Sequence, residues 1–551
     1  MRLDDDSYQH FARSFQQVST LNVSAWLLDV WNKPLTGLLY GVAGLLGLHA
    51  ARLVSVGLTV ATGFLTALLC QRLVPTHLAN GLWFAVVFFA AQMAVLKDAF
   101  VTMTEVPAAF FVALSLWLCL VHQKRALAGL CAGLVPLCRA EMLPVTGFIG
   151  AWLALACWRE RDASSIRRWG WWLPLVLAGL PFVLWVGAGI LASHDLFWFS
   201  HSSYASFRSW GLSGVLRYNV LSGLPAVLAA PALPWLFVGI FGAPRLFSSK
   251  NDRFTLLLLV GTIGIHYLLL NTLVVFPKGW LGLPDGHAVA AVNARNYTPT
   301  APVVAVFIAL GVSLWVQSAP EFRRLFVHSM LVSAIAIVLG RYGAWGQLAL
   351  DLCLLGLMSA VVLGTNRTRE HWAPGRFWTI AAAATLAGAF LVRPFFWYPT
   401  LWNDKRAASV EALLELVRRE RPQRVVQDLA SAPEVYGGLQ GVDASWTYPH
   451  LFLEQAVRGR PPTLLVVETN AAGRPVERYP EALVQQVRQA ALGEPDASRK
   501  MLQLQLVSRF SSPPQAAWLA FVDRLAAKNA PVHWAAYRIL DAQRVTESNA
   551  Q

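Results

Sequence analysis

Long apolar runs separated by short polar segments fill most of the first 400 residues. Runs long enough, or nearly so, to cross a bilayer as a helix lie at about 48–70, 79–96, 100–121, 171–193, 224–242, 254–276, 299–317, 325–340, 345–364 and 377–394. The run 126–157 is too long for one crossing and is interrupted by Arg139 and Glu141, so we expect a hairpin of two helices. The pattern predicts an all-α polytopic membrane protein with about twelve transmembrane helices.

The pattern changes at about residue 400. The charged, amphipathic stretch 404–420 predicts a helix, and short apolar runs follow at 425–426, 464–467 and 501–507. Polar helical stretches at 480–492 and 516–528 lie between or after these runs. Such alternation is typical of an α/β fold. We therefore expect a transmembrane domain with juxtamembrane helices over 1–398 and a small soluble α/β domain over 399–551.

Composition agrees with a membrane protein. Hydrophobic residues make up 56% of the chain and charged residues only 14%, whereas a soluble domain has about 25% charged residues. The 23 tryptophans fit helices anchored at both membrane interfaces. We interpret the net charge of +14 as basic residues in cytoplasmic loops, not as nucleic-acid binding. The six cysteines lie in apolar segments without zinc-site spacing, which argues against a disulfide framework.

The loops between the apolar runs alternate in charge. Basic residues gather in 71–72, 124–125, 159–168, 245–253, 323–324 and 367–376, which we expect to be cytoplasmic. The N-terminal carboxylates, the segments 97–105, 194–222 and 277–298, and the C-terminal region must then face the other side. We expect an integral protein of the bacterial inner membrane whose acidic cluster and C-terminal domain face the periplasm or exterior.

Three consecutive carboxylates, Asp4, Asp5 and Asp6, precede an amphipathic stretch. The apolar residues of this stretch recur at helical spacing and predict one face; they are Tyr8, Phe11, Phe15 and Val18. The remaining surface is polar and includes Gln9, Arg13, Gln16 and Gln17. This pattern predicts a helix that lies in the membrane interface. An acidic tail with an ordinary helix cap is the alternative interpretation.

Other ionisable residues interrupt the apolar runs on the same predicted side. Asp98 and Glu105 are seven residues apart, which predicts two turns on one helical face. Because charges at membrane depth are costly, such residues are candidates for function. A helix start that simply favours acidic residues would give the same pattern.

Cations are rare on this predicted side. Lys278 and Arg295 lie in the loop before the 299–317 run, and a guanidinium there could bind a phosphate. An interface anchor is the alternative. Arg139 could likewise point at a phosphate, or it could form an ion pair with Glu141 that stabilises the hairpin turn.

Together these motifs resemble the C superfamily of integral-membrane glycosyltransferases, which use polyprenyl-phosphate-linked sugars. Its members include protein O-mannosyltransferases, the aminoarabinose transferase of lipid A and mannosyltransferases of lipid-linked glycans. The similar segments, in chain order, are Asp5-Asp6-Ser7-Tyr8 (with Asp4 as an alternative register), Thr104-Glu105-Val106-Pro107 with Asp98 nearby, 129–141, and Arg295-Asn296-Tyr297 leading to Pro299. Each motif is short, and their order and common side carry the resemblance over residues 4–400.

Two features depart from the family's pattern. Members have a transmembrane helix directly before the acidic pair, so we expect a first helix encoded upstream of Met1 or a truncated chain. Asn296 also stands where many relatives have another residue.

The resemblance implies transfer of a sugar from a polyprenyl-phosphate donor to a lipid, glycan or protein acceptor, with inversion, by a hexosyltransferase-type enzyme of cell-envelope glycan biosynthesis. Asp5, or Asp4, would be the general base. Arg295 with Lys278 would neutralise the leaving phosphate. The implied substrate-binding residues also include Asp6, Tyr8, Asp98, Glu105, Arg139 and Tyr297.

A divalent cation, Mg²⁺ or Mn²⁺, is an open possibility because hard cations prefer oxygen ligands. Its ligands would be Asp5, Asp6 and Glu105. Two other functions stay open at this point: a transporter or flippase of lipid-linked saccharides, and a polysaccharide ligase or polymerase. A transporter would favour charged sites near the bilayer midplane, whereas most acids here lie at the predicted outer rim.

Overall fold

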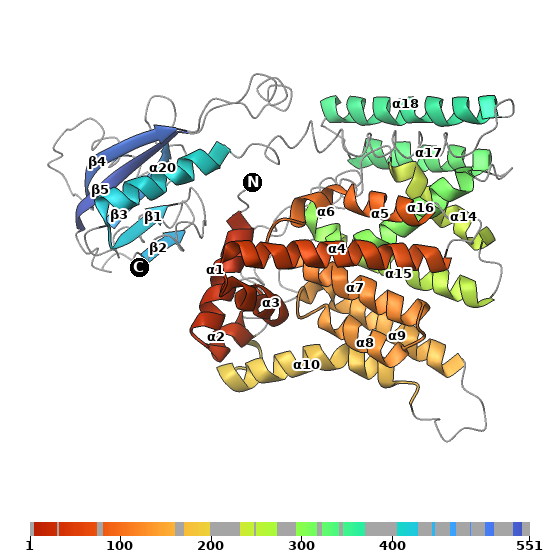
Figure 1. Cartoon of the computed structure of the whole chain (residues 1–551), viewed down its shortest axis with the longest axis horizontal. Coiled ribbons are helices and arrows are strands. Elements are labelled where there is room, and N and C mark those ends of the chain that lie inside the picture. Colours follow the sequence, from red (N-terminus) through yellow and green to blue (C-terminus); the bar gives the residue numbers. More distant parts are fainter. Residues whose placement is uncertain are drawn as a thin grey trace, which may run out of the picture. The chain divides into compact units, whose positions relative to one another are not determined.

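A computed structural model describes residues 5–29, 32–73, 81–159, 170–198, 232–246, 250–272, 294–316, 322–340, 345–369, 405–427, 443–446, 463–469, 485, 502–511 and 533–542. The chain divides into two compact units (Figure 1). The larger unit is Arg13–Arg393, and the smaller one combines Met1–Ala12 with Pro394–Gln551. The first helix, α1, runs across the boundary between them.

The larger unit is built of helices in its described part. They are α1 (Asp5–Ser19), α2 (Val23–Leu28), α3 (Pro34–Gly44), α4 (Leu48–Leu73), α5 (Gly81–Ala90), α6 (Met93–Asp98), α7 (Glu105–Leu120), α8 (Arg125–Leu134), α9 (Leu143–Arg159), α10 (Leu173–Ser193), α14 (Leu233–Leu246), α15 (Lys250–Thr272), α16 (Ala301–Val316), α17 (Phe322–Gly340) and α18 (Trp345–Arg369). Two 3-10 helices, η2 (Ala140–Met142) and η7 (Ala294–Thr300), precede α9 and α16.

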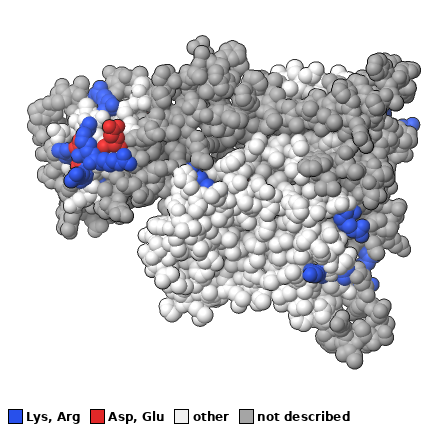
Figure 2. Space-filling view, in the orientation of Figure 1, with Lys and Arg blue, Asp and Glu red and all other residues white. Residues whose placement is uncertain are grey.

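Four helical segments in the described residues are long and apolar enough to cross a membrane: Leu48–Leu73, Ala140–Arg159, Leu173–Ser193 and Tyr297–Trp315. Several leucine and valine side chains on α4 and α10 are exposed, among them Leu53 and Val183. Figure 2 shows that much of the described surface of the larger unit on this face carries no charged side chain. Such a surface fits a protein surrounded by lipid. The count of about twelve crossings stays a prediction.

The helix boundaries correct the expected spans in two places. The run 79–96 is broken between α5 and α6, where the Gln92 side-chain amide donates to the Ala301 carbonyl at 2.9 Å. The run 100–121 becomes helical only at Glu105. Asp98 and Glu105 therefore end one helix and begin the next, and they do not share two turns of a single helix. The expected run 377–394 lies outside the described residues.

The expected hairpin over 126–157 is confirmed. Helix α8 ends at Leu134, and α9 begins at Leu143 after η2. Arg139 has an extended backbone at the start of this break. Gly129 and Gly133 of α8 are positions where an added Cβ would collide with backbone atoms of α10. These glycines let the hairpin lie directly on α10, as small residues do in membrane helix packing.

The N-terminal helix buries polar as well as apolar side chains. Phe11 of the predicted apolar face is buried and Phe15 is 41% exposed, while Ser14 and Gln17 are buried although Gln17 was expected on the polar surface. An added Cβ at Gly41 of α3 would collide with the Ser14 carbonyl. The α1 backbone therefore packs closely on α3, and polar partners fill the buried face.

The smaller unit contains a five-stranded mixed sheet in the order β2-β1-β3-β5-β4. Its strands are β1 (Arg424–Gln427), β2 (Asp443–Trp446), β3 (Thr463–Thr469), β4 (Leu502–Ser511) and β5 (His533–Ala542), and helix α20 (Lys405–Glu420) precedes β1. Strand β1 pairs in parallel with β2 and β3, while β5 pairs antiparallel with β3 and β4. Leu465 lies opposite Tyr537 in this register. The expected helix at 404–420 and strands near 425, 464 and 501 are confirmed; the helices expected at 480–492 and 516–528 fall almost wholly outside the described residues.

Candidate functional site

Four residues of alternating charge lie where the hairpin break meets the start of α7; three of their side chains are buried, and that of Glu141 is 26% exposed. Arg139 Nη1 lies 2.5 Å from Glu105 Oε1, and Arg139 also pairs with Glu141. Lys33 Nζ lies 4.0 Å from the other oxygen of Glu141. Thr104 donates its hydroxyl to Glu105 Oε2 at 3.0 Å. In space the four charged groups follow one another as Lys33, Glu141, Arg139 and Glu105, so each charge has a neighbour of opposite sign.

Burial makes this charge chain consequential. The side chains of Arg139 and Glu105 are 7% and 4% exposed, and that of Lys33 is 5% exposed. Charges removed from water this far are costly unless they are paired and hydrogen-bonded. The break in the α8–α9 hairpin provides the geometry, because a continuous helix would direct Arg139 and Glu141 to different sides.

Lys33 has an unusual backbone conformation. Its φ is 54° and its ψ is 142°, a region that costs a residue with a side chain on the order of 1–3 kcal/mol. The ψ value suits the residue before a proline, and Pro34 begins α3. Burial lowers the pKa of the Lys33 ammonium, and the carboxylates of Glu141 and Glu105 offset part of that shift. Strain and burial together mark Lys33 as a functional candidate.

Sequence reasoning missed Lys33. The available signal is a single lysine directly before a proline and an apolar run, on the predicted outer side of the membrane.

A second polar cluster joins the end of α6 to η7. Asp98 is fully buried, and its Oδ2 accepts a hydrogen bond from Thr298 Oγ1 at 2.7 Å. Thr298 belongs to η7, the 3-10 helix that also contains Arg295 and Tyr297. The structure thus brings the Asp98 segment and the Arg295 segment together, although they are some 200 residues apart in the chain.

Aromatic side chains surround this second cluster. Tyr297 is 1% exposed, and its ring centroid lies 4.7 Å from that of Tyr267 on α15. His266 Nδ1 lies 2.8 Å from the Thr300 hydroxyl. The hydroxyls of Tyr267 and Tyr297 are buried and have no hydrogen-bond partner among the residues that the structure describes. Phenol groups in such a position are suited to accept a polar ligand.

Tyr40 lies between the two clusters. Its hydroxyl donates to the Met103 carbonyl at 3.1 Å, within the segment that links Asp98 to Glu105. The charges of both carboxylates act on this phenol. Ser55 of α4 donates to the Val101 carbonyl at 2.8 Å and so also fixes this segment. The segment 99–104 is therefore held rigidly between Asp98 and Glu105.

The remaining predicted residues lie at the edge of what the structure describes. Asp5, Asp6 and Tyr8 begin α1, and Arg295 lies in η7, but their side chains are not among those described. Asp4 and Lys278 lie outside the described residues altogether. Whether the opening aspartates, Glu105 and Arg295 converge on one cavity stays a prediction.

The residues for a divalent cation fit only in part. In the described residues no three His, Cys, Asp or Glu side chains gather as metal ligands. Glu105 already accepts from Thr104 and pairs with Arg139. A guanidinium next to this carboxylate would repel a cation. A cation would therefore have to depend mainly on Asp5 and Asp6.

Neither a family model nor a curated protein matches this sequence. Two solved structures are similar in fold: crystal structures of ArnT from Cupriavidus metallidurans, one in the apo state and one bound to undecaprenyl phosphate. Each aligns with a TM-score of 0.54 and 13% sequence identity over 97% of this chain and 94% of that chain. At this identity the likeness concerns the fold alone. The chain thus has a fold like that of ArnT, and its apolar helices fit an integral membrane protein.

Proposed function

We propose that this protein is a membrane glycosyltransferase that transfers a sugar from a polyprenyl-phosphate donor to an acceptor on the periplasmic or exterior side. The observation that carries the proposal is the pair of buried polar clusters around Glu105 and Asp98 in an ArnT-like fold. One of the similar ArnT structures is bound to undecaprenyl phosphate. Buried charges in an otherwise apolar fold are expected at a site of chemistry.

The reaction exchanges one bond at the anomeric carbon for another. The acceptor oxygen attacks the anomeric carbon, and the bond between this carbon and the phosphate oxygen breaks with inversion of configuration. Asp5, with Asp4 as the alternative, accepts the acceptor's proton as general base. Polyprenyl phosphate leaves with the electron pair of the broken bond.

The phosphate needs positive charge as the bond breaks. Arg295 and Lys278 supply it in this proposal. Lys33 is added to them because its ammonium is buried and lies 4.0 Å from Glu141, and because its backbone is strained. An ammonium can donate three hydrogen bonds, so Lys33 can hold Glu141 and a phosphate oxygen together.

The other residues orient the substrates. Glu105, Asp98 and Asp6 bind sugar or acceptor hydroxyls, and Tyr8 and Tyr297 contact the donor. Arg139 was predicted to bind substrate. Its pairing with Glu105 and Glu141 favours another role, which is to neutralise and orient these two carboxylates.

The test is sugar transfer in membranes that contain the full chain. Radiolabelled polyprenyl-phosphate sugars are supplied as a panel, and transfer to endogenous acceptors is counted for wild type, Asp5→Asn, Asp4→Asn and Glu105→Gln. Asp195→Asn is the matched control. Asp195 follows α10, and the side-chain oxygen of the asparagine that replaces it can still accept the hydrogen bond from Phe197 N–H. We expect Asp5→Asn to lower transfer by about a hundredfold or more and Asp195→Asn to match wild type.

The assay also separates the alternatives. If Asp5→Asn and Asp4→Asn both match wild type, the general-base assignment is wrong. If wild type moves the labelled lipid across the membrane without transferring its sugar, the protein is a transporter or flippase.

A further inference from the structure

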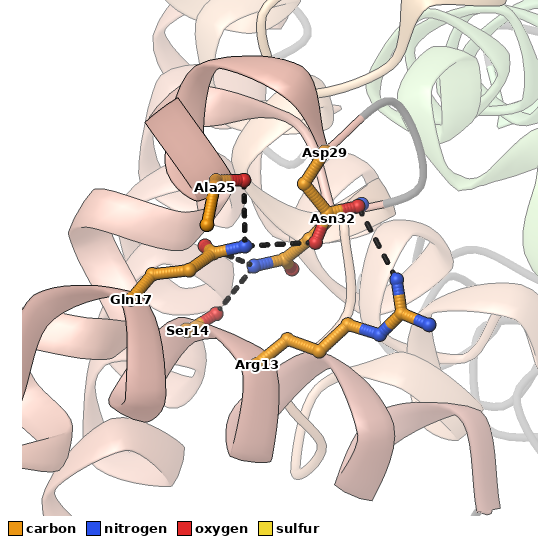
Figure 3. A network of polar contacts seen from close by, with 6 residues as sticks. All are labelled: Arg13, Ser14, Gln17, Ala25, Asp29 and Asn32. Carbon is orange, nitrogen blue, oxygen red and sulfur yellow. Dashed lines mark hydrogen bonds and ion pairs between the residues drawn. The ribbon is translucent and has the colours of Figure 1, made fainter. Parts of the chain in front are cut away.

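A polar network joins α1 to the turn that carries Lys33 (Figure 3). The Gln17 side-chain amide is engaged at both ends. Its nitrogen donates to Asp29 Oδ2 at 2.8 Å and to the Ala25 carbonyl at 3.4 Å, and its oxygen accepts from Asn32 Nδ2 at 3.4 Å. Asn32 Nδ2 also donates to Ser14 Oγ at 2.8 Å. Ser14, Gln17 and Asn32 are all buried, so this network packs a side of α1 that was expected to be exposed and polar.

Asp29 organises the turn itself. Its carboxylate accepts the Asn32 backbone N–H at 2.9 Å, and its carbonyl accepts the Lys33 backbone N–H at 3.0 Å. One residue thus fixes both amides immediately before the strained backbone of Lys33. A strained conformation persists only where the surrounding structure determines it strongly. The Asp29 carboxylate also acts on the Lys33 ammonium by its charge.

The network has little room to shift. An added Cβ at Gly37 of α3 would lie 3.1 Å from Asn32 Nδ2 and 3.1 Å from Gln17 Oε1. One turn further, Gly41 allows the Ser14 carbonyl to approach α3 directly. Two glycines at this spacing lie on one face of α3. They leave the network in direct contact with α3, the helix that Lys33 directly precedes.

We propose that Gln17 and Asp29 are positioning residues that hold the Lys33 ammonium where it meets the donor phosphate; this inference rests on the function proposed above. Neither residue needs to touch the substrate. Because α1 is one continuous helix, the same contacts restrain the element that begins at the predicted catalytic aspartates.

The experiment measures lipid binding to the purified full-length protein in detergent. The probes are undecaprenyl phosphate and undecaprenol, which differ only in the phosphate. The variants are Gln17→Leu and, as a second route if that variant fails to fold, Asp29→Ala and Asp29→Asn. Gln16→Leu is the matched control, since Gln16 is the same residue type on the exposed side of the same helix.

We expect wild type to prefer undecaprenyl phosphate, and Gln17→Leu to lower this preference about tenfold, which corresponds to 1.4 kcal/mol, with undecaprenol affinity unchanged. Gln16→Leu should keep the preference. Asp29→Asn should retain more of it than Asp29→Ala, because the amide oxygen can still accept from Asn32 N–H.

Two outcomes overturn the positioning role while the proposed function stands: the preference survives in Gln17→Leu and Asp29→Ala, or both lipids weaken equally, as a purely structural role requires. If wild type shows no preference for the phosphate, the proposed donor class is wrong, and the positioning role falls with it.

Discussion

Replacing Arg139 by methionine tests the buried charge chain most directly. The substitution keeps much of the side-chain volume but removes the guanidinium that lies 2.5 Å from Glu105 and also pairs with Glu141. Two carboxylates then lose their shared partner, and Glu141 keeps a second cation, Lys33, at 4.0 Å.

The burial of the pair sets the magnitude. Both Arg139 and Glu105 are less than one tenth exposed, so the small values measured for surface ion pairs do not apply. Breaking a buried pair by removing one partner costs about 3–5 kcal/mol, because the other charge stays buried and uncompensated. We therefore expect Arg139→Met to lower the free energy of unfolding by about 3–5 kcal/mol.

The double variant Arg139→Met with Glu105→Gln carries the reasoning further. With Glu105 neutral, the remaining Glu141 still has Lys33, so most of the loss should return. Removing both members of a buried pair is often close to neutral, and we expect the double variant within about 1–2 kcal/mol of wild type. The pair would then show a coupling energy of at least about 1 kcal/mol.

Unfolding by a denaturing detergent, followed by the fluorescence of the 23 tryptophans, measures all four corners of this cycle. Ser19→Ala on the exposed end of α1 serves as the control, and it should match wild type. A double variant as unstable as Arg139→Met alone would refute the charge-pair argument, since it would mean that Arg139 acts through packing.

Three further predictions follow from other parts of the structure. Burial lowers the pKa of Lys33, and the Glu141 carboxylate offsets part of that shift. Glu141→Gln should therefore lower this pKa further, so that undecaprenyl phosphate binding is lost at a lower pH as the ammonium deprotonates. A binding titration in which the loss moves to higher pH would contradict this. Gly239→Ala would drive a Cβ into the Phe307 carbonyl of α16 and should lower the free energy of unfolding by about 1–3 kcal/mol. Gly264→Ala, with open space around it, should leave the stability unchanged or raise it. Equal melting temperatures for these two variants would show that α14 and α16 can separate freely. In the smaller unit, hydrogen bonds from Arg419 and Arg538 lower the pKa of Glu420. The stability that this carboxylate adds is therefore present above about pH 4.3, its pKa in the unfolded chain, and is lost as the pH falls. Glu420→Gln should flatten the acid dependence of hydrogen exchange in β5, and an unchanged dependence would count against the ion pair.

Long uniform segments were predictable from the sequence. The runs that became α4 and α10 are long and apolar enough to predict helices despite Arg52 and Pro181 within them. The charges of Arg139 and Glu141 mark the hairpin break correctly, since charges in an apolar span need partners. The break between α5 and α6 was not predictable, since it depends on the bond from Gln92 to a carbonyl 209 residues away.

The buried face of α1 shows the limit of periodicity. Spacing alone places Gln17 on the polar surface of the helix, and the structure buries it. The deciding factor is a set of polar partners on another segment, Asp29 and Asn32, that satisfies both ends of the Gln17 amide. A single sequence does not reveal such pairing, because hydrogen-bond partners follow from tertiary contact and not from local pattern. Strands β2 and β5 were missed for a related reason: their place is fixed by pairing with β1, β3 and β4.

The charge balance of the site shows why the residues beyond the described part matter for the proposed chemistry. Lys33, Glu141, Arg139 and Glu105 carry two positive and two negative charges, so this chain is neutral before a ligand arrives. A polyprenyl phosphate brings negative charge into a region where water is scarce, and Lys33 can offer it hydrogen bonds but no net compensation while Glu141 stays ionised. The compensating charge must come from outside the four, and the bond between Asp98 and Thr298 brings the 3-10 helix of Arg295 beside the acidic segment. The neutrality of these four residues is therefore an argument for a cation from outside them, and Arg295 is the candidate whose 3-10 helix the Asp98–Thr298 bond brings beside the acidic segment.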